Sequence, residues 1–143
     1  MIDILRAKVV DEALMEALHR LLPQLSEHAQ VPSVERMTQL LAEENTHLFV
    51  ACDEQNKIVG VLTLLLVDIP TGRKAWIEDV VTDIAAQGKG VGRALVERAV
   101  EVARAEGAKR IYLTSNPKRE AAHALYRRCG FIPYDTTVFR LEL

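Results

Sequence analysis

Residues 87–92 combine glycine and lysine in a pattern that suits the binding of an anion. The hexapeptide reads Gln87-Gly88-Lys89-Gly90-Val91-Gly92 and holds three of the seven glycines of the chain. Glycines let the backbone approach a ligand closely, and the free amides at the start of a helix carry about half a positive charge. Lys89 and Arg93 add full positive charges. We therefore predict a site for a phosphate or pyrophosphate group.

Two common phosphate-binding loops do not fit this hexapeptide. The dinucleotide fingerprint needs a third glycine where this chain has Arg93. The nucleoside triphosphate loop ends in Gly-Lys-Ser or Gly-Lys-Thr, which the chain lacks. Gly92 costs a helix about 1 kcal/mol relative to alanine, and close approach of a ligand would explain that cost. On spacing alone, a tight turn without a ligand remains the alternative.

Two neighbouring acids, Glu78 and Asp79, lie in a strand-forming stretch just before the hexapeptide. A carboxylate at this place could take part in general acid–base catalysis. Adjacent residues of a regular strand point to opposite faces of a sheet, so we expect only one of the two to face a given cleft. The other acid would form a surface ion pair or a turn hydrogen bond.

A second group of reactive side chains lies near the predicted helix 120–129. Tyr126 lies mid-helix, and on spacing alone a core tyrosine is the commoner outcome. His123 shares its helix face and would line an acceptor cleft or the edge of the core. Cys129 is expected to be buried and unreactive. Lys118 and Arg119 would contact phosphate or form a solvated basic turn.

The remaining sequence predicts a mixed α/β fold that positions these groups. Asp11 and Ser33 are suited to cap two early helices, and Gly107 is suited to end a long helix with a broad apolar stripe. The expected strands are 2–6, 47–52, 58–67, 75–82, 110–114, 131–134 and 138–143, and the later helices are 88–106 and 120–129. The crossover 75–114 should make its two strands parallel. We expect a central mixed sheet of six to seven strands flanked by about four helices.

Composition narrows the class of protein. The 143 residues predict one domain, 1–143, and the ten-residue apolar run 58–67 is too short to span a membrane. The start of the chain has no secretory signal. Two cysteines and four scattered histidines argue against a disulfide framework and a metal site, and favour a cytoplasmic protein with reduced thiols. A net charge of −2 and 5% aromatic residues argue against a nucleic-acid partner.

The charge is unevenly distributed along the chain. Residues 1–86 hold 7 basic and 14 acidic side chains, a net charge of −7, whereas residues 87–143 hold 11 basic and 6 acidic ones, a net charge of +5. The change of sign occurs at the start of the hexapeptide. An anion site in the second part and a cation site in the first would account for about six of these charges, and solvated helix faces for the rest.

Three segments together resemble the GNAT superfamily of N-acetyltransferases. The hexapeptide matches the pattern Gln/Arg-x-x-Gly-x-Gly/Ala, which binds the pyrophosphate of acyl-CoA in that family. The stretch 76–83 is similar to its central strand. The order of elements matches almost the whole chain, including two helices between the first two strands. The matching positions are Gln87, Gly90 and Gly92 in the loop, and Ala122, Tyr126, Gly130 and Phe131 in the segment Ala-x-x-x-Tyr-x-x-x-Gly-Phe.

This resemblance implies a GNAT-like fold with acetyl-CoA as co-substrate and no metal. It implies that the backbone of residues 80–82 pairs with pantetheine and polarises the thioester carbonyl, that Tyr126 protonates the departing sulfur, and that Glu78 or Asp79 accepts the amine proton. Acetyl would pass directly to a primary amine in a ternary complex. The implied cofactor-binding residues are Val80, Val81, Thr82, Gln87, Gly88, Lys89, Gly90, Val91, Gly92, Arg93, Arg119 and Tyr126.

The chain departs from the family pattern at one place. The family often has asparagine seven residues before the tyrosine, where this chain has Arg119, and Asn116 is out of register. Arg119 would meet the cofactor or the substrate instead. Two other functions stay open: a non-catalytic module that binds acyl-CoA, and an enzyme acting on nucleotide phosphates, which the loop patterns disfavour.

The acceptor is expected to be a small-molecule or peptide amine. The run 77–81 is similar to the strand of glucosamine-phosphate N-acetyltransferases, but five residues do not assign a substrate. The resemblance also implies a homodimer, formed through the final strands.

Overall fold

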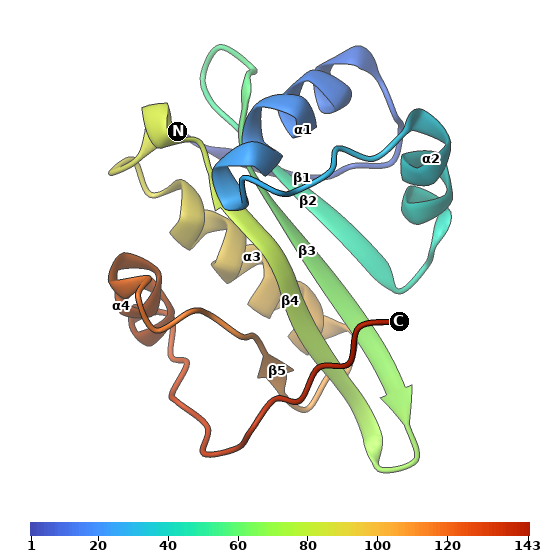
Figure 1. Ribbon diagram of the computed structural model, residues 1–143, viewed down its shortest axis with the longest axis vertical. Helices are drawn as coiled ribbons and strands as arrows, with labels where there is room; N and C mark the ends of the chain where they lie inside the picture. The colour runs from blue at the N-terminus through green and yellow to red at the C-terminus, as the bar shows by residue number, and fades with distance from the viewer.

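A five-stranded sheet with the order β1-β2-β3-β4-β5 is the centre of the computed structural model, which describes residues 1–143 (Figure 1). Its strands are β1 (Asp3–Arg6), β2 (Thr46–Cys52), β3 (Ile58–Ile69), β4 (Gly72–Thr82) and β5 (Ile111–Tyr112). β1, β2, β3 and β4 pair with one another in antiparallel fashion. β5 is parallel to β4, which confirms the parallel pairing predicted for the crossover.

Four helices flank the sheet, as the sequence predicted. They are α1 (Glu12–Leu25), α2 (Val34–Ala42), α3 (Val91–Ala105) and α4 (Glu120–Arg128), and a short 3₁₀ helix, η1 (Ile84–Ala86), follows β4. Asp11 and Ser33 are the predicted caps: the Asp11 carboxylate accepts the amide of Leu14 at 2.8 Å, and the Ser33 hydroxyl accepts that of Arg36 at 3.1 Å. Each cap satisfies one amide that a helix start leaves free.

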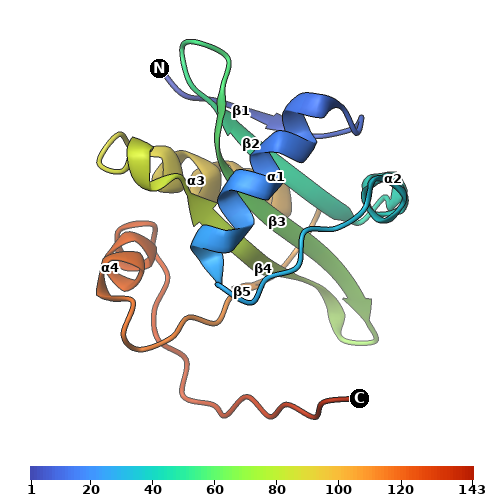
Figure 2. The same ribbon diagram turned by 45° about the horizontal axis from the view of Figure 1, so that its top comes forward.

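The helices cover both faces of the sheet (Figure 2). α1 and α2 pack on one face, where the buried side chains include Leu14, Leu18, Leu21, Met37, Val61 and Val81. α3 and α4 pack on the other, where they include Phe49, Leu62, Leu64, Ile77, Leu95, Val96 and Tyr126. Burial of each of the larger aliphatic side chains contributes about 1.5–3 kcal/mol. The predicted apolar stripe of the long helix is therefore the face of α3 that packs on the sheet.

Gly60 of β3 sets how closely the start of α3 approaches the sheet. A Cβ atom at this position would lie 2.7 Å from Cγ1 of Val91 and 3.1 Å from Cδ1 of Leu95. Only glycine leaves room for the first turn of α3. The helix terminus that follows the glycine-rich loop is thus held directly against β3.

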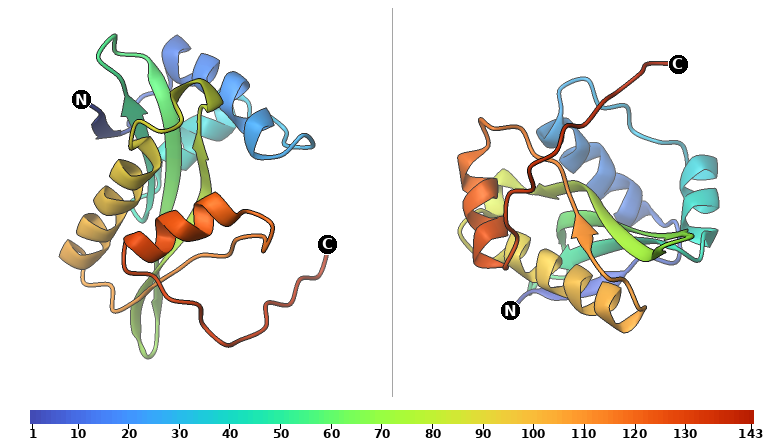
Figure 3. Two further views of the ribbon diagram at one scale, coloured as in Figure 1. Left: turned by 90° about the vertical axis from the view of Figure 1, so that its left-hand side faces the viewer. Right: turned by 90° about the horizontal axis from the view of Figure 1, so that it is seen from below.

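The last part of the chain differs from the sequence prediction. Residues 131–134 and 138–143 form no strands, and β5 has only two residues instead of the expected 110–114. No backbone hydrogen bond involves residues 132–143, which run as an extended chain beyond α4 (Figure 3). A strand needs a partner with free backbone groups in register, and an alternating sequence does not supply that partner. The sheet therefore has five strands instead of six or seven.

This unpaired segment exposes many apolar side chains. Phe139 and Leu141 are 91% and 81% exposed. We call residues 132–143 the C-terminal segment. Its exposed large apolar residues are Ile132, Tyr134, Val138, Phe139, Leu141 and Leu143.

Candidate active site

A β-bulge interrupts β4 at the two acids. Thr63 of β3 pairs with Glu78 and Val61 pairs with Val81, so Leu62 faces two residues of β4 instead of one. Asp79, one of these two, has a φ of 51°, in the left-handed region. The extra residue changes which face of the sheet the following side chains reach.

The packing of β4 shows that side chains after the bulge reach the opposite face of the sheet. Ile77 belongs to the core on the α3 face, whereas Val81, four residues later, belongs to the core on the α1 face. Val80 packs against the α3 side. The expectation that Glu78 and Asp79 point to opposite faces relied on regular alternation, which the bulge breaks. Both acids are exposed.

The environment of Glu78 favours its protonated form. Partial burial raises the pKa of Glu78, and the neighbouring negative charge of Asp79 raises it further. A carboxylate with a raised pKa holds a proton more strongly and is a better proton acceptor. The arrangement thus suits Glu78 to act as a general base, with Asp79 strengthening it.

The glycine-rich loop follows directly after η1. Gly88 and Gly90 have φ angles of 81° and 79°, and a Cβ atom at either position would meet nothing within 4 Å. The left-handed backbone, not crowding, is what requires glycine at these two places. Gly90 begins α3, and no side chain caps this helix start. Its free amides and the open space beside the glycines leave room for an anionic ligand.

Packing against α4 accounts for the glycine at position 92. A Cβ atom there would lie 3.0 Å from Cδ2 of Leu125 and 3.4 Å from the hydroxyl of Thr82. The close approach of α4 onto α3 therefore explains why this residue is glycine, and its contact with a ligand stays a prediction. The glycine lets Leu125 of α4 pack against the first turn of α3.

The predicted cations of the site differ in their partners. Arg93 is paired with Glu97 one turn further along α3, so its charge is partly neutralised. Lys89 is exposed and forms no ion pair. Lys118 and Arg119 lie in the exposed turn before α4, where the amide of Lys118 donates to the Asn116 side chain at 2.9 Å. Lys89 is thus the cation of the loop that is free to meet an anion.

Tyr126 lies on the inner face of α4 and is 8% exposed. Its ring packs against Phe131, with centroids 6.1 Å apart. Burial raises the pKa of the Tyr126 hydroxyl, and the positive charge of Arg119 opposes this shift. The hydroxyl stays protonated near neutral pH and can donate a proton. None of the side-chain hydrogen bonds of the chain engages it.

Tyr126 also lines a cavity of about 870 Å³ between β5, α3, α4 and the C-terminal segment. His123 and Ser115 line the same cavity, and their Nε2 and Oγ atoms are buried without hydrogen-bond partners. Neither Glu78, Asp79 nor any residue of the loop lines it. The structure thus brings Tyr126 and His123 together and leaves the two acids outside this cavity.

Cys129 also lines the cavity. Burial raises the pKa of its thiol, and the charge of Glu97 adds to this shift. A thiol that resists ionisation is a poor nucleophile. Cys129 is partly buried instead of fully buried as expected, and its low reactivity stays a prediction. No group of three or more metal-ligating side chains is present, and none of the helices is both long and apolar enough to cross a membrane.

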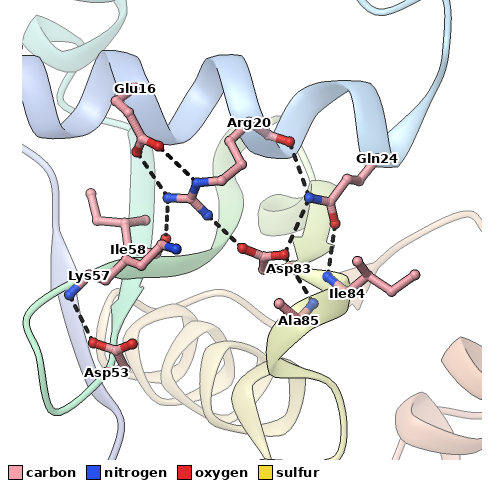
Figure 4. Close-up of polar contacts among 9 residues, drawn as sticks. All are labelled: Glu16, Arg20, Gln24, Asp53, Lys57, Ile58, Asp83, Ile84 and Ala85. Carbon is pink, nitrogen blue, oxygen red and sulfur yellow. Dashed lines mark hydrogen bonds and ion pairs between the residues drawn. The ribbon is translucent and has the colours of Figure 1, made fainter.

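Sequence reasoning missed Arg20, Gln24 and Asp83, which form a hydrogen-bonded cluster between α1 and the end of β4 (Figure 4). Arg20 forms an ion pair with Glu16 one turn earlier, which in sequence reads as an ordinary exposed helix pair. The only other signal was an acid directly after a predicted strand and before the glycine-rich loop. Spacing does not show which distant side chain such an acid meets.

Two relatives in sequence are both named as N-acetyltransferases. The sequence is 31% identical over 116 residues to aminoglycoside N(6')-acetyltransferase type 1 of Stenotrophomonas maltophilia, covering 77% of this chain and 76% of that protein. It is 39% identical over 61 residues to glucosamine 6-phosphate N-acetyltransferase 1 of Oryza sativa subsp. japonica. That match covers 43% of this chain, and the chain spans only 35% of the length of the rice enzyme.

The fold also has close relatives among solved structures. An aminoglycoside acetyltransferase from an uncultured soil metagenomic sample, solved in complex with trehalose, superimposes with a TM-score of 0.87 at 25% identity, covering 99% of this chain and 96% of that one. The sequence profile of the acetyltransferase (GNAT) family matches residues 12–131, from α1 to the end of the site described above. The chain therefore belongs to the GNAT acetyltransferase family.

Proposed function

We propose that the protein is an acetyl-CoA-dependent N-acetyltransferase that passes acetyl directly to a primary amine in a ternary complex, with residues 1–143 acting as one domain. The observation that carries this proposal is the uncapped start of α3, where Gly88 and Gly90 leave open space beside Lys89. This is the donor set that a pyrophosphate requires. Val91, Gly92, Arg93 and Arg119 complete the surroundings of the cofactor.

When bound, acetyl-CoA supplies the activated acetyl group as a thioester. The bulged backbone of residues 80–82 would align the cofactor and offer an amide to its carbonyl oxygen. Glu78 accepts the proton of the attacking amine, since an ammonium group has no free electron pair. Tyr126 donates its proton to the departing sulfur. The raised pKa of Glu78 and the protonated Tyr126 suit these two roles.

The acceptor follows from the charge of the site. Glu78 and Asp79 form an exposed pair of acids, which attracts a cationic amine. The two related enzymes named above are named for an aminoglycoside and for glucosamine 6-phosphate, both amine-bearing sugars. We infer that the acceptor of this chain is a small molecule or peptide with a primary amine.

One assay separates the proposed function from its alternatives. Release of CoA thiol from acetyl-CoA is measured over a panel of amines, and binding of CoA, ATP and NAD is measured by calorimetry. Turnover with at least one amine supports the transferase. Binding of CoA without turnover on any amine would identify a non-catalytic acyl-CoA module. Binding of ATP or NAD but not CoA would contradict the proposal.

A pair of glycine variants tests the cofactor loop itself. Gly88 and Gly107 have φ angles of 81° and 82°, and neither would place a Cβ near any atom. Gly88→Ala and Gly107→Ala therefore strain the backbone equally, at about 1 kcal/mol each. Only Gly88→Ala should weaken CoA binding, because Gly107 lies at the far end of α3. Equal CoA affinity in both variants would remove the loop from the binding site.

We further propose that two copies of the chain associate through the C-terminal segment. Its apolar side chains are exposed and its backbone is unpaired. Light scattering should show a dimer for the full chain and a monomer for a chain ending at Phe131. A monomeric full chain would contradict this proposal. The cytoplasmic location stays a prediction that rests on the two free cysteines, Cys52 and Cys129.

A further inference from the structure

Asp83 connects β4 to the glycine-rich loop and is held by two side chains of α1 (Figure 4). Asp83 is 5% exposed. Arg20 Nη1 donates to Asp83 Oδ2 at 2.7 Å, and Gln24 Nε2 donates to Asp83 Oδ1 at 3.3 Å. Although burial raises the pKa of Asp83, hydrogen bonds from the Ala85 amide, Gln24 and Arg20 lower it below its usual range. The buried carboxylate is therefore fully engaged and charged.

Gln24 also binds backbone groups near this carboxylate, one in η1 and one in its own helix. Its Oε1 accepts the amide of Ile84 at 2.9 Å, while its Nε2 also donates to the carbonyl of Arg20 at 3.2 Å. Asp83 Oδ1 accepts the next amide, that of Ala85, at 3.1 Å. The first two amides of η1 are thus held by side chains, one of them from a helix 60 residues away in sequence.

Arg20 is itself fixed in place. It forms a two-pronged contact with Glu16, at 2.9 and 3.0 Å, and donates to the carbonyl of Ile58 at 2.8 Å. A guanidinium oriented by three hydrogen bonds to Glu16 and Ile58 offers one defined position for Asp83. We call Arg20, Gln24 and Asp83 the α1 clamp. The clamp joins α1, the first residue of β3 and the end of β4.

The chain from the clamp to the loop is short. The Ala86 amide donates to the Asp83 carbonyl at 2.8 Å, and the Gln87 amide donates to the Ile84 carbonyl at 3.4 Å. Beyond Gln87, Gly88 and Gly90 contribute no side chain that could hold the loop. The N-terminal end of the loop is therefore held by the α1 clamp, and its C-terminal end is held by α3.

We propose that the α1 clamp positions residues 87–92 to receive the pyrophosphate of acyl-CoA, with Gln24 and Asp83 as positioning residues that do not touch the ligand. This inference rests on the proposed function. A loop held in its binding conformation loses less entropy when the ligand binds, so the clamp acts on cofactor affinity rather than on the acetyl transfer step.

Gln24→Ala is the informative variant. It removes two contacts to the loop entrance and leaves the Arg20–Asp83 pair intact, whereas removal of Arg20 would leave a buried charge unpaired and strongly destabilise the fold. The matched control is Gln39→Ala in α2, where the glutamine is exposed. A second variant, Asp83→Asn, keeps an oxygen for the Ala85 amide and for Gln24 Nε2, but replaces the oxygen that accepts from Arg20 with an NH2 group and so removes that contact.

Three measurements test the proposal on the full chain. Gln24→Ala should raise the Kd for CoA about five- to tenfold, raise KM for acetyl-CoA to match, and leave kcat at saturation unchanged. Amide exchange of Ile84, measured by NMR without ligand, should become faster, and that of the loop should follow. Gln39→Ala should change none of these, and Asp83→Asn should give a smaller rise in Kd.

The outcomes distinguish a failure of the α1 clamp from a failure of the proposed acetyltransferase function. Unchanged Ile84 exchange and unchanged CoA affinity in Gln24→Ala would overturn the clamp, as would a loss of kcat with KM unchanged. A general loss of melting temperature with the same Kd below the transition would show a merely structural role and would also overturn it. If the wild-type chain binds no CoA, the proposed function fails, while the exchange of residues 84–92 still decides whether the clamp orders the loop.

Discussion

The acids Glu78 and Asp79 and the tyrosine Tyr126 are attached to the molecule in different ways. The acids lie on β4, which pairs with β3 from Gly72 to Thr82 and is covered on both faces. Tyr126 lies on α4, which is followed by an unpaired segment and preceded by a strand of only two residues. The proposed base is thus built into the sheet, whereas the proposed acid depends on a few contacts of one helix.

This difference teaches that the two sides of the proposed reaction centre are stabilised separately. The position of α4 depends on the contact of Leu125 with Gly92 and on the packing of Tyr126 against Phe131. The position of the acids depends on strand pairs with β3 on both sides of the bulge. Four experiments test this division, beginning with the largest expected effect.

Tyr126→Phe should lower kcat about 10³-fold and leave KM for acetyl-CoA nearly unchanged, because the variant keeps the ring and loses only the proton donor. Steady-state kinetics with the best amine of the panel measures both constants. Tyr112→Phe is the matched control, since Tyr112 lines the same cavity and stacks on Trp76 at 5.1 Å. An unchanged kcat in Tyr126→Phe would remove this residue from the mechanism.

Leu62→Ala and Leu141→Ala compare the two regions in stability. Leu62 of β3 is fully buried in the core on the α3 face, and its truncation should lower the free energy of unfolding by about 2–5 kcal/mol. Leu141 is 81% exposed, and its truncation should change the free energy of unfolding by less than about 0.5 kcal/mol. Urea unfolding at low protein concentration measures both. A large cost at Leu141 would show that the C-terminal segment is packed in solution.

Glu78→Gln should lower kcat about 10²-fold at neutral pH, because the amide cannot accept the amine proton. Asp79→Asn is its matched control and should cause a smaller loss. Rates are compared at saturating acetyl-CoA. If Asp79→Asn caused the larger loss, the role of base would pass to Asp79.

The pH dependence of Asp79→Asn gives the smallest effect. The negative charge of Asp79 favours the protonated form of Glu78 and so raises the pKa of that carboxyl. Removal of the charge lowers this pKa, and Glu78 then stays ionised to lower pH. The acidic limb of the kcat profile should therefore move to lower pH in Asp79→Asn. A limb that stays in place, or moves to higher pH, would show that Glu78 does not set it.

Much of the fold could be predicted from the sequence because the signals are local. Asp11 and Ser33 predict where two helices start, and the apolar stripe from Val91 to Ala103 predicts a helix that packs on a sheet. The glycine-rich loop could be predicted because its left-handed backbone requires glycine at Gly88 and Gly90, and glycines stand out in a sequence. These features depend on residues within a few positions of one another.

The remainder depends on partners that spacing does not reveal. The alternation in residues 138–143 is that of a strand, but no backbone group lies in register to pair with it. The bulge at Asp79 was hidden because aspartate, unlike glycine, does not mark a left-handed position. Asp83 meets Arg20 across 63 residues of sequence. For Gly92, the residue that crowds the Cβ position is Leu125, from a helix that follows later in the sequence.

Asp79 has one further consequence, for the balance of stability and activity. Its left-handed backbone, with φ of 51°, costs a non-glycine residue about 1 kcal/mol. A glycine would adopt this conformation without the cost but would remove the charge beside Glu78. The chain thus keeps a carboxylate at a position where backbone preference alone would favour glycine. The fold is less stable than it could be at the place where the second charge adjoins the proposed base.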